Sequence, residues 1–189
     1  MLILASASPR RKTLLENAGL DFIICPAERE INPVGSLSPE EYAVESAYAK
    51  ALEVAAKFDK TNIVLGADTI VYLDGEIIGK PKDKADAYGI LKKLSGNTHR
   101  VYTGYALVKD GKITKGCEVT NVTFRVLEDD EIYDYIDSGE PMDKAGAYGV
   151  QERGCVFVKA IDGDFYNVMG LPICSVYTAI RSILGENKT

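Results

Sequence analysis

Hydroxyl and cationic side chains gather between residues 6 and 12, directly after a short apolar run. Ser6-Ala7-Ser8-Pro9-Arg10-Arg11-Lys12 follows residues 2–5, which are typical of a buried strand. Ser8 as an N-cap and Pro9 at the first helical position predict that a helix begins here. The N–H groups of a helix N-terminus and the forked donors of Arg suit phosphate oxygens. The segment is therefore a candidate phosphate site, although a capped surface helix with a solvated basic turn explains the same residues.

A second candidate is Gly66-Ala67-Asp68-Thr69, which follows the apolar strand expected at residues 63–65. We expect Asp68 at the carboxyl end of that strand, where ligand sites of open α/β sheets gather. A carboxylate there can hold a divalent metal or take a proton from water. A turn aspartate that caps backbone amides is the alternative interpretation.

Two lysines are candidates for phosphate binding. Gly79-Lys80-Pro81-Lys82 superficially matches a P-loop, but its spacing from Gly75 is one residue short and Pro81 replaces Ser or Thr. What remains is a basic loop that could present Lys80 to a phosphate. Lys50 lies on an expected helix, where a solvated lysine is the alternative.

The segment at residues 143–151 combines two glycines with small residues, which permits close backbone approach. At its end, Gln151 offers both a donor and an acceptor to the edge of a base. A plain connecting loop is the alternative. We interpret His99, the single histidine of the chain, as structural.

The elements that position these candidates alternate between expected strands and expected helices. This alternation predicts an α/β fold. A capping box at Ser38 and Glu41 and two-residue turns at Asp74-Gly75 and Asp110-Gly111 give the clearest boundaries. We expect strands at residues 2–5, 22–25, 63–65, 69–73, 76–78, 101–108, 113–126, 155–161 and 165–168. Helices are expected from Pro9 to just before Gly19, from Pro39 to about Phe58, and at residues 84–94, 129–136 and 172–184.

Composition limits the classes of function. The 189 residues are 46% hydrophobic and carry a net charge of −6, which suits one domain over residues 1–189 and argues against general nucleic-acid binding. No stretch is long enough to span a membrane, and the first residues lack the basic segment and long apolar run of a secretory signal. The four cysteines form no CxxC pair, so we expect reduced, mostly buried thiols and a cytoplasmic protein.

The motifs occur together in an order and spacing that resemble the Maf family from end to end. They are Ser6-x-Ser8-Pro9-Arg10-Arg11, Lys50, Gly66-Ala67-Asp68-Thr69, Gly79-Lys80-Pro81, Leu94-Ser95-Gly96, Asp143-Lys144-Ala145-Gly146-Ala147-Tyr148-Gly149-x-Gln151 and Gly170-Leu171-Pro172. The resemblance implies a fold related to the inosine-triphosphate pyrophosphatases, with a long curved mixed sheet, flanking helices and two lobes about a cleft. It also implies a homodimeric pyrophosphatase that needs Mg²⁺ or Mn²⁺ and converts a nucleoside triphosphate to the monophosphate and pyrophosphate.

The same resemblance implies roles for individual residues. Asp68 would be the proton acceptor that activates water for attack on the α-phosphorus, and Asp68 and Glu30 would be the metal ligands. The triphosphate would be bound by Arg10, Arg11, Lys50 and Lys80, with a hydroxyl contact from Ser6. Thr69 and Gln151 would contact the pyrimidine.

Arg10, Thr69 and Gln151 resemble the family branch that acts on dTTP and UTP, whereas the 7-methyl-GTP branch carries Trp, Gln and Glu at these positions. Glu152-Arg153 departs from relatives that have glycine after the glutamine, which bears on the shape of the base pocket. Two alternatives stay open: a 7-methyl-GTP pyrophosphatase, and a nucleotide-binding regulator of division without turnover. A role in septum formation, cell-division control or nucleotide-pool cleansing is likewise left open.

Overall fold

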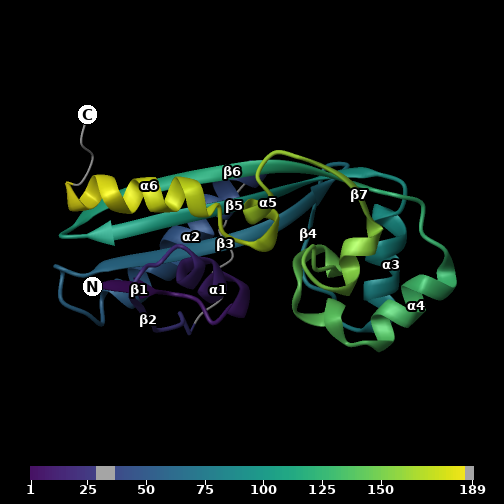
Figure 1. Ribbon diagram of the computed structural model, residues 1–189, viewed down its shortest axis with the longest axis horizontal. Coiled ribbons are helices and arrows are strands. Elements are labelled where there is room, and N and C mark those ends of the chain that lie inside the picture. The colour runs from purple at the N-terminus through teal and green to yellow at the C-terminus, as the bar shows by residue number, and fades with distance from the viewer. Residues whose placement is uncertain (29–36, 186–189) are drawn as a thin grey trace. The chain divides into compact units, whose positions relative to one another are not determined.

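A mixed β-sheet runs through the structure (Figure 1). The structure is a computed structural model and describes residues 1–28 and 37–185. Within those residues the sheet has seven strands in the order β2-β1-β3-β5-β6-β7, with β4 paired to β3. The strands are β1 (Leu2–Leu4), β2 (Phe22–Ile24), β3 (Ile63–Leu73), β4 (Glu76–Ile78), β5 (Thr98–Lys109), β6 (Lys112–Phe124) and β7 (Val158–Asp162). The expected α/β fold with a mixed sheet is confirmed.

Helices connect and flank these strands. The α-helices are α1 (Pro9–Asn17), α2 (Pro39–Ala55), α3 (Lys84–Leu94), α4 (Asp129–Asp137), α5 (Phe165–Met169) and α6 (Ile173–Leu184). The described residues also contain the short 3₁₀ helices η1 (Glu140–Asp143), η2 (Ala145–Ala147) and η3 (Arg153–Phe157). The strand β1 pairs in parallel with both β2 and β3. Parallel neighbours need crossover connections, and here α1 connects β1 to β2 and α2 connects β2 to β3.

The chain divides into two compact units. Unit 1 comprises Met1–Thr69, Thr103–Glu118 and Gly170–Thr189, and unit 2 comprises Ile70–Tyr102 and Val119–Met169. The strands β3, β5 and β6 each contribute residues to both units. A single domain with a cleft between two lobes stays a prediction.

Two-residue Asp-Gly turns join consecutive strands. Asp74 and Gly75 have φ values of 50° and 88°, and Asp110 and Gly111 have φ values of 50° and 75°. Positive φ at both central residues is the type I′ geometry that matches the twist of antiparallel strands. Both expected turns are confirmed, and β4 pairs antiparallel with β3.

In unit 1, α2 begins where the sequence predicts. Ser38 Oγ accepts a hydrogen bond from Glu41 N at 3.2 Å, and Glu41 Oε2 accepts one from Ser38 N at 2.8 Å. This reciprocal pair is the expected capping box. The helix ends at Ala55, short of the expected Phe58.

The helix α2 packs on the sheet through its smallest residues. Ala43, Ala47 and Ala51 recur every fourth position and are fully buried. A Cβ at Gly66 would lie 2.1 Å from the Ala47 carbonyl oxygen, and one at Gly104 would lie 2.4 Å from that of Ala43. The two glycines therefore let the α2 backbone lie directly on β3 and β5.

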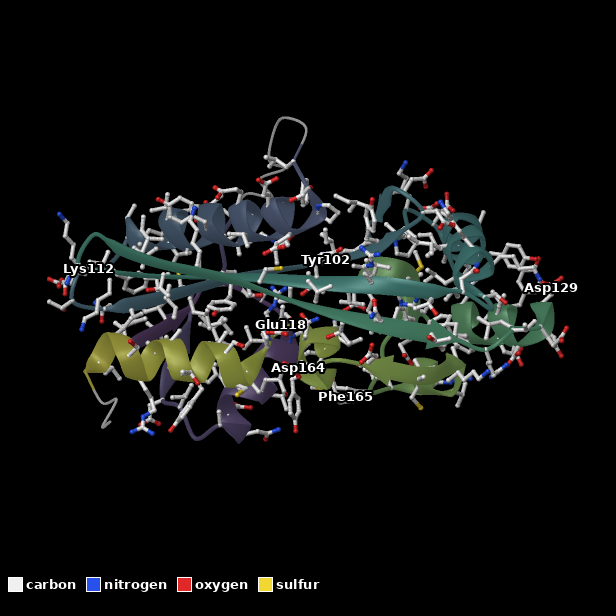
Figure 2. The ribbon with its side chains drawn as sticks, turned by 90° about the horizontal axis from the view of Figure 1, so that it is seen from above. Tyr102, Lys112, Glu118, Asp129, Asp164 and Phe165 are labelled. Carbon is white, nitrogen blue, oxygen red and sulfur yellow. The ribbon has the colours of Figure 1, made fainter. Side chains whose placement is uncertain are left out.

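The opposite face of the sheet in unit 1 carries α6. Figure 2 shows the strands edge-on between α2 and α6. Val176 and Ile180 are the buried residues of α6, and Ser175 Oγ donates a hydrogen bond to Glu118 Oε2 on β6 at 3.4 Å. The C-terminal helix is thus fixed to the sheet by an apolar stripe and one polar contact.

In unit 2, α3 and α4 lie against each other. Tyr88 on α3 stacks on Tyr133 of α4 with ring centroids 5.0 Å apart, and Lys92 forms an ion pair with Asp129 at 2.6 Å. Asp83 caps α3 by accepting a hydrogen bond from Asp86 N at 2.8 Å. Both helices also contact η1.

One expected strand near the C-terminus is wrong, and another starts later than predicted. Residues 165–168 belong to the helix α5, whereas the strand predicted at 155–161 begins only at Val158, as β7, after the 3₁₀ helix η3. Asp164 Oδ1 accepts a hydrogen bond from Tyr166 N at 2.7 Å, which favours a helix start. The buried Asn167 donates to Val101 O at 3.0 Å and to Thr120 Oγ1 at 2.9 Å, which anchors that helix from within.

The cysteines are free thiols, but they are not mostly buried as expected. Cys25 and Cys117 are half-buried, whereas Cys155 and Cys174 are exposed. Burial, aided by the nearby Glu40 and Glu118 carboxylates, raises the pKa of Cys117 to about 12. In the described part of the chain, no helix combines the length and apolarity needed to cross a membrane.

Candidate functional site

Asp68 and Thr69 lie within a strand and not at its end. The sequence predicts two strands separated by a loop, but β3 continues from Ile63 to Leu73. Gly66 is required here by the close approach of α2 and not by a turn. Because side chains alternate along a strand, Asp68 shares the α2 face with Gly66, and Thr69 faces the other way.

Asp68 forms an ion pair with Lys50 of α2. Lys50 Nζ donates a hydrogen bond to Asp68 Oδ1. The side chains are 16% and 18% exposed, so the pair is shielded from water but still reachable. The pairing depends on the packing of α2 against Gly66, because that close approach brings the helix residue down to the strand carboxylate.

On the other side of β3, Arg11 links three segments of unit 1. Its Nε donates to Gly170 O at 2.8 Å, its Nη1 donates to Ser6 Oγ at 2.9 Å, and its Nη2 donates to Thr69 Oγ1 at 3.2 Å. A guanidinium has five N–H donors, so this network leaves two N–H groups for a further anion. Arg11 is therefore held in one orientation before any ligand binds.

Thr69 is itself held by Thr103 of β5. The two hydroxyl oxygens are 2.9 Å apart, and Thr69 Oγ1 also donates to Gly170 O at 3.4 Å. Thr103 is fully buried. Thr103 was not predicted as a site residue, because a threonine within a strand carries no motif signal. Gly170 was predicted only as part of a motif, although its carbonyl accepts hydrogen bonds from both Arg11 and Thr69.

Burial and two neighbouring charges shift the pKa of Arg11. Burial lowers the pKa of the Arg11 guanidinium, the Asp68 carboxylate opposes that shift, and the Arg10 cation adds to it. Arg11 stays charged, because a guanidinium is not deprotonated in proteins. A fixed cation thus lies within electrostatic reach of the Asp68 carboxylate.

Ser6, at the start of the candidate phosphate segment, replaces Ser8 as the hydroxyl that binds a backbone amide. Ser8 occupies the N-cap of α1 but makes no side-chain capping bond, and its own N–H donates to Ser6 Oγ at 3.2 Å. Ser6 therefore receives hydrogen bonds from both Ser8 N and Arg11. The half-buried Arg10 lies in the first turn of α1.

The structure therefore brings Ser6, Arg11 and Thr69 together in unit 1. Asp68 and Lys50 form a separate pair on the α2 side of β3, within electrostatic reach of Arg11. Lys80 and Gln151 are exposed and belong to unit 2. There, Gly146 N donates to Gly79 O at 3.0 Å, which joins the Lys80 loop to the segment that precedes Gln151. Glu30 lies outside the described residues.

The protein atoms provide few ligands for a metal ion. Among residues 1–28 and 37–185, no three His, Cys, Asp or Glu side chains gather closely enough to hold one. Mg²⁺ is commonly bound by one or two carboxylates together with substrate phosphates and water. Asp68, whose Oδ1 is engaged by Lys50, fits an ion that the triphosphate also coordinates.

His99 has the structural environment expected from the sequence. It is buried in unit 2, with its Nε2 2.8 Å from the Tyr148 hydroxyl and its ring edge-on to Phe124. Burial lowers the pKa of His99 to about 4, so the imidazole is neutral near pH 7.

Comparison with known proteins gives consistent matches over most of the chain. A family model described as "Maf-like protein" matches residues 1–183. The chain is 50% identical over 173 residues to a dTTP/UTP pyrophosphatase from Thermococcus gammatolerans, which covers 92% of this chain and 91% of the relative. It is 49% identical over 183 residues to a dTTP/UTP pyrophosphatase from Alkaliphilus oremlandii, with 96% and 95% covered.

Among solved structures, a HAM1 protein from Coxiella burnetii has a similar fold. The TM-score is 0.50 at 16% identity, with 96% of this chain and 98% of that chain covered. At this identity the likeness concerns the fold alone.

Proposed function

We propose that this chain, which belongs to the family of Maf-like proteins, hydrolyses dTTP and UTP to the nucleoside monophosphate and pyrophosphate. One structural observation carries the proposal: the Asp68 carboxylate is fixed by Lys50 within electrostatic reach of the Arg11 cation. The dTTP/UTP pyrophosphatases to which the chain is about half identical support the choice of substrate.

Asp68 is the proposed general base. Lys50 holds Oδ1, which leaves Oδ2 to orient a water molecule. The water oxygen attacks the α-phosphorus, its proton passes to Asp68, and the bond from the α-phosphorus to the bridging oxygen breaks. Pyrophosphate leaves with that oxygen. Positioned general bases of this kind contribute roughly 10²- to 10⁴-fold to a rate.

The cations of unit 1 are the proposed phosphate contacts. Arg11 is preorganised by Ser6, Thr69 and Gly170, so its remaining N–H groups can meet phosphate oxygens without reorganisation. Arg10 adds charge in the same turn of α1. We also retain Lys80 as a phosphate contact and Gln151 as a base contact, on the strength of their motif matches.

A divalent cation, Mg²⁺ or Mn²⁺, completes the proposal. Asp68 would hold it together with the triphosphate, and Glu30 is retained as a second proposed ligand. When bound, the ion supplies charge neutralisation at the phosphate oxygens. We further propose a cytoplasmic homodimer, and light scattering coupled to size-exclusion chromatography would measure the mass of the assembly.

A nucleotide panel tests the proposed function. Pyrophosphate release is measured for dTTP, UTP, dATP, GTP and 7-methyl-GTP, with Mg²⁺, with Mn²⁺ and with EDTA. We expect cation-dependent release from dTTP and UTP at a kcat/KM well above that for the purines. A preference for 7-methyl-GTP would contradict the substrate assignment. Nucleotide-dependent thermal stabilisation without any pyrophosphate release would indicate a binding regulator instead.

A further inference from the structure

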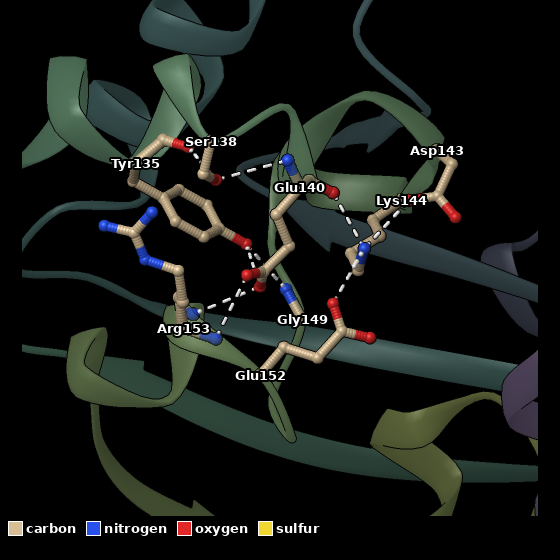
Figure 3. Close-up of polar contacts among 9 residues, drawn as sticks. Tyr135, Ser138, Glu140, Asp143, Lys144, Gly149, Glu152 and Arg153 are labelled. Atoms are coloured by element: carbon tan, nitrogen blue, oxygen red, sulfur yellow. Dashed lines mark hydrogen bonds and ion pairs between the residues drawn. The ribbon is translucent and has the colours of Figure 1, made fainter.

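The Glu140 carboxylate organises the segment that carries Gln151. Figure 3 shows this side chain among the polar contacts of unit 2. Glu140 Oε1 accepts hydrogen bonds from Tyr135 Oη at 2.8 Å and from Gly154 N at 3.2 Å. Its Oε2 accepts one from Arg153 N at 3.1 Å. One side chain thus fixes two consecutive backbone amides on the C-terminal side of Gln151.

The N-terminal side of Gln151 is fixed through the same group. The Tyr135 hydroxyl, which donates to Glu140, accepts a hydrogen bond from Gly149 N at 3.1 Å. A Cβ at Gly149 would lie 2.8 Å from Lys144 Cε, and one at Gly154 would lie 2.9 Å from the Tyr135 hydroxyl oxygen. A side chain at either position would therefore crowd the contacts around Glu140 and Tyr135.

Lys144 provides a second anchor. Its side chain is 7% exposed, and its Nζ donates to Glu140 O at 2.7 Å and to Asp143 Oδ1 at 2.8 Å. The same ammonium pairs with Glu152 Oε2 at 3.2 Å. A buried cation with this many oxygen partners is costly to displace, because removing a partner leaves a charged group unsatisfied.

These contacts surround Gln151 on both sides, whereas Gln151 itself is exposed. We propose that Glu140, Tyr135 and Lys144 are positioning residues for substrate specificity: they fix the backbone at residues 149–154 and so aim Gln151 at the edge of the pyrimidine. The inference rests on the proposed function. It also gives Glu152 a role as the side chain that ties this segment to Lys144.

Tyr135→Phe is the sharpest test, because it removes one hydroxyl and keeps the ring, which packs edge-on against Phe157 at 4.9 Å. The matched control is Tyr133→Phe on the same helix, where the residue is exposed. The measured quantity is the ratio of kcat/KM for dTTP to kcat/KM for GTP. We expect Tyr135→Phe and Glu140→Gln to lower this ratio roughly tenfold, mainly through KM for dTTP, because misaligned polar groups lose base discrimination.

A double variant separates positioning from general stability. In the Gln151→Ala background, Tyr135→Phe is expected to change the ratio less than about twofold, since residues that act through one another are not additive. Equal losses for dTTP and GTP, or a full additional loss in the Gln151→Ala background, would overturn the positioning role.

Hydrogen exchange provides a readout that does not depend on activity. Amides of residues 149–154 should exchange faster in Tyr135→Phe than in Tyr133→Phe, and equal exchange would contradict the anchoring. Unmodified protein that hydrolyses no dTTP would overturn the proposed function. Unmodified protein that hydrolyses dTTP, with unchanged discrimination in both Tyr135→Phe and Glu140→Gln, would overturn the positioning role alone.

Discussion

The Arg11 guanidinium donates a hydrogen bond from Nη2 to the Thr69 hydroxyl, with 3.2 Å between Nη2 and Oγ1. A hydroxyl offers one donor and two acceptor positions. In Thr69 all three are used when it accepts from Arg11 and Thr103 and donates to Gly170 O. Thr69 therefore acts as a support for Arg11, whereas the family resemblance implies a contact with the pyrimidine. The two roles predict different kinetics.

Thr69→Val keeps the shape of the side chain and removes its hydroxyl. If Thr69 supports Arg11, kcat/KM should fall roughly tenfold for dTTP and by the same factor for GTP, because a buried donor is left without its acceptor. Thr69→Ser, which keeps the hydroxyl, should stay within about threefold of the unmodified protein. A loss confined to dTTP and UTP would favour base recognition by Thr69 instead.

Asp68→Asn tests the proposed general base. The amide cannot accept the proton of the attacking water, so we expect kcat to fall by roughly 10²- to 10⁴-fold. Circular dichroism and urea denaturation would show whether the fold is retained. Turnover of dTTP close to that of the unmodified protein, in a folded variant, would remove Asp68 from this role.

Local signals predicted the parts of the fold that depend on neighbours in sequence. The capping box at Ser38 and Glu41 and the turn at Asp74-Gly75 are confirmed, because each is determined by a few adjacent residues. Residues 165–168 were predicted as a strand from their apolar residues. They belong to the helix α5, in which Asn167 binds β5 and β6, and these long-range contacts are not visible in the local sequence.

The sequence predicted which residues belong to the candidate site, but not which of them contact one another. The motifs identified Ser6, Arg11 and Asp68, and the structure places these residues together in unit 1. The sequence could not show that Arg11 binds Thr69 and Gly170, since residues 11 and 170 meet only in the folded chain. Gly66 was interpreted as the end of a strand. A glycine that ends a strand and a glycine that packs closely against a helix cannot be distinguished in the sequence alone.

Gly66→Ala tests the packing that brings Lys50 to Asp68. The added methyl group would lie 2.1 Å from the backbone oxygen of Ala47. We expect a loss of about 1–3 kcal/mol or more in the free energy of unfolding, because overpacking forces α2 away from the sheet. Urea denaturation measures this change.

The matched control is Gly89→Ala in α3, where a Cβ would meet no atom within 4 Å. This variant should raise the free energy of unfolding by about 0.5–1 kcal/mol, because alanine favours a helix over glycine. Equal stability of the Gly66→Ala variant and the unmodified protein would contradict the direct contact between α2 and β3.

His99 predicts a specific pH dependence of stability. Burial lowers the pKa of His99 from 6.5 to about 4, so between these values the unfolded chain binds a proton that the folded chain does not. The contribution of the neutral His99 to the free energy of unfolding is complete above pH 6.5. It declines by about 3 kcal/mol in total as the pH falls toward 4. His99→Gln should flatten the free energy of unfolding over this range.

The lowered pKa of the Glu131 carboxylate changes stability at a lower pH than His99 does. The Arg125 guanidinium, with a further hydrogen bond from Glu128 N, lowers the pKa of Glu131 from 4.5 to about 2, so that contribution is lost only as the pH falls below about 4.5. An unchanged slope between pH 6.5 and 4.5 in the His99→Gln variant would contradict the buried neutral histidine.

The proposed reaction requires that water attacks the α-phosphorus of dTTP. Hydrolysis in H₂¹⁸O, followed by mass spectrometry of both products, tests it directly. We expect dTMP and pyrophosphate in equal amounts, with one ¹⁸O in dTMP and none in pyrophosphate. Label in pyrophosphate, or dTDP and orthophosphate as the products, would contradict it.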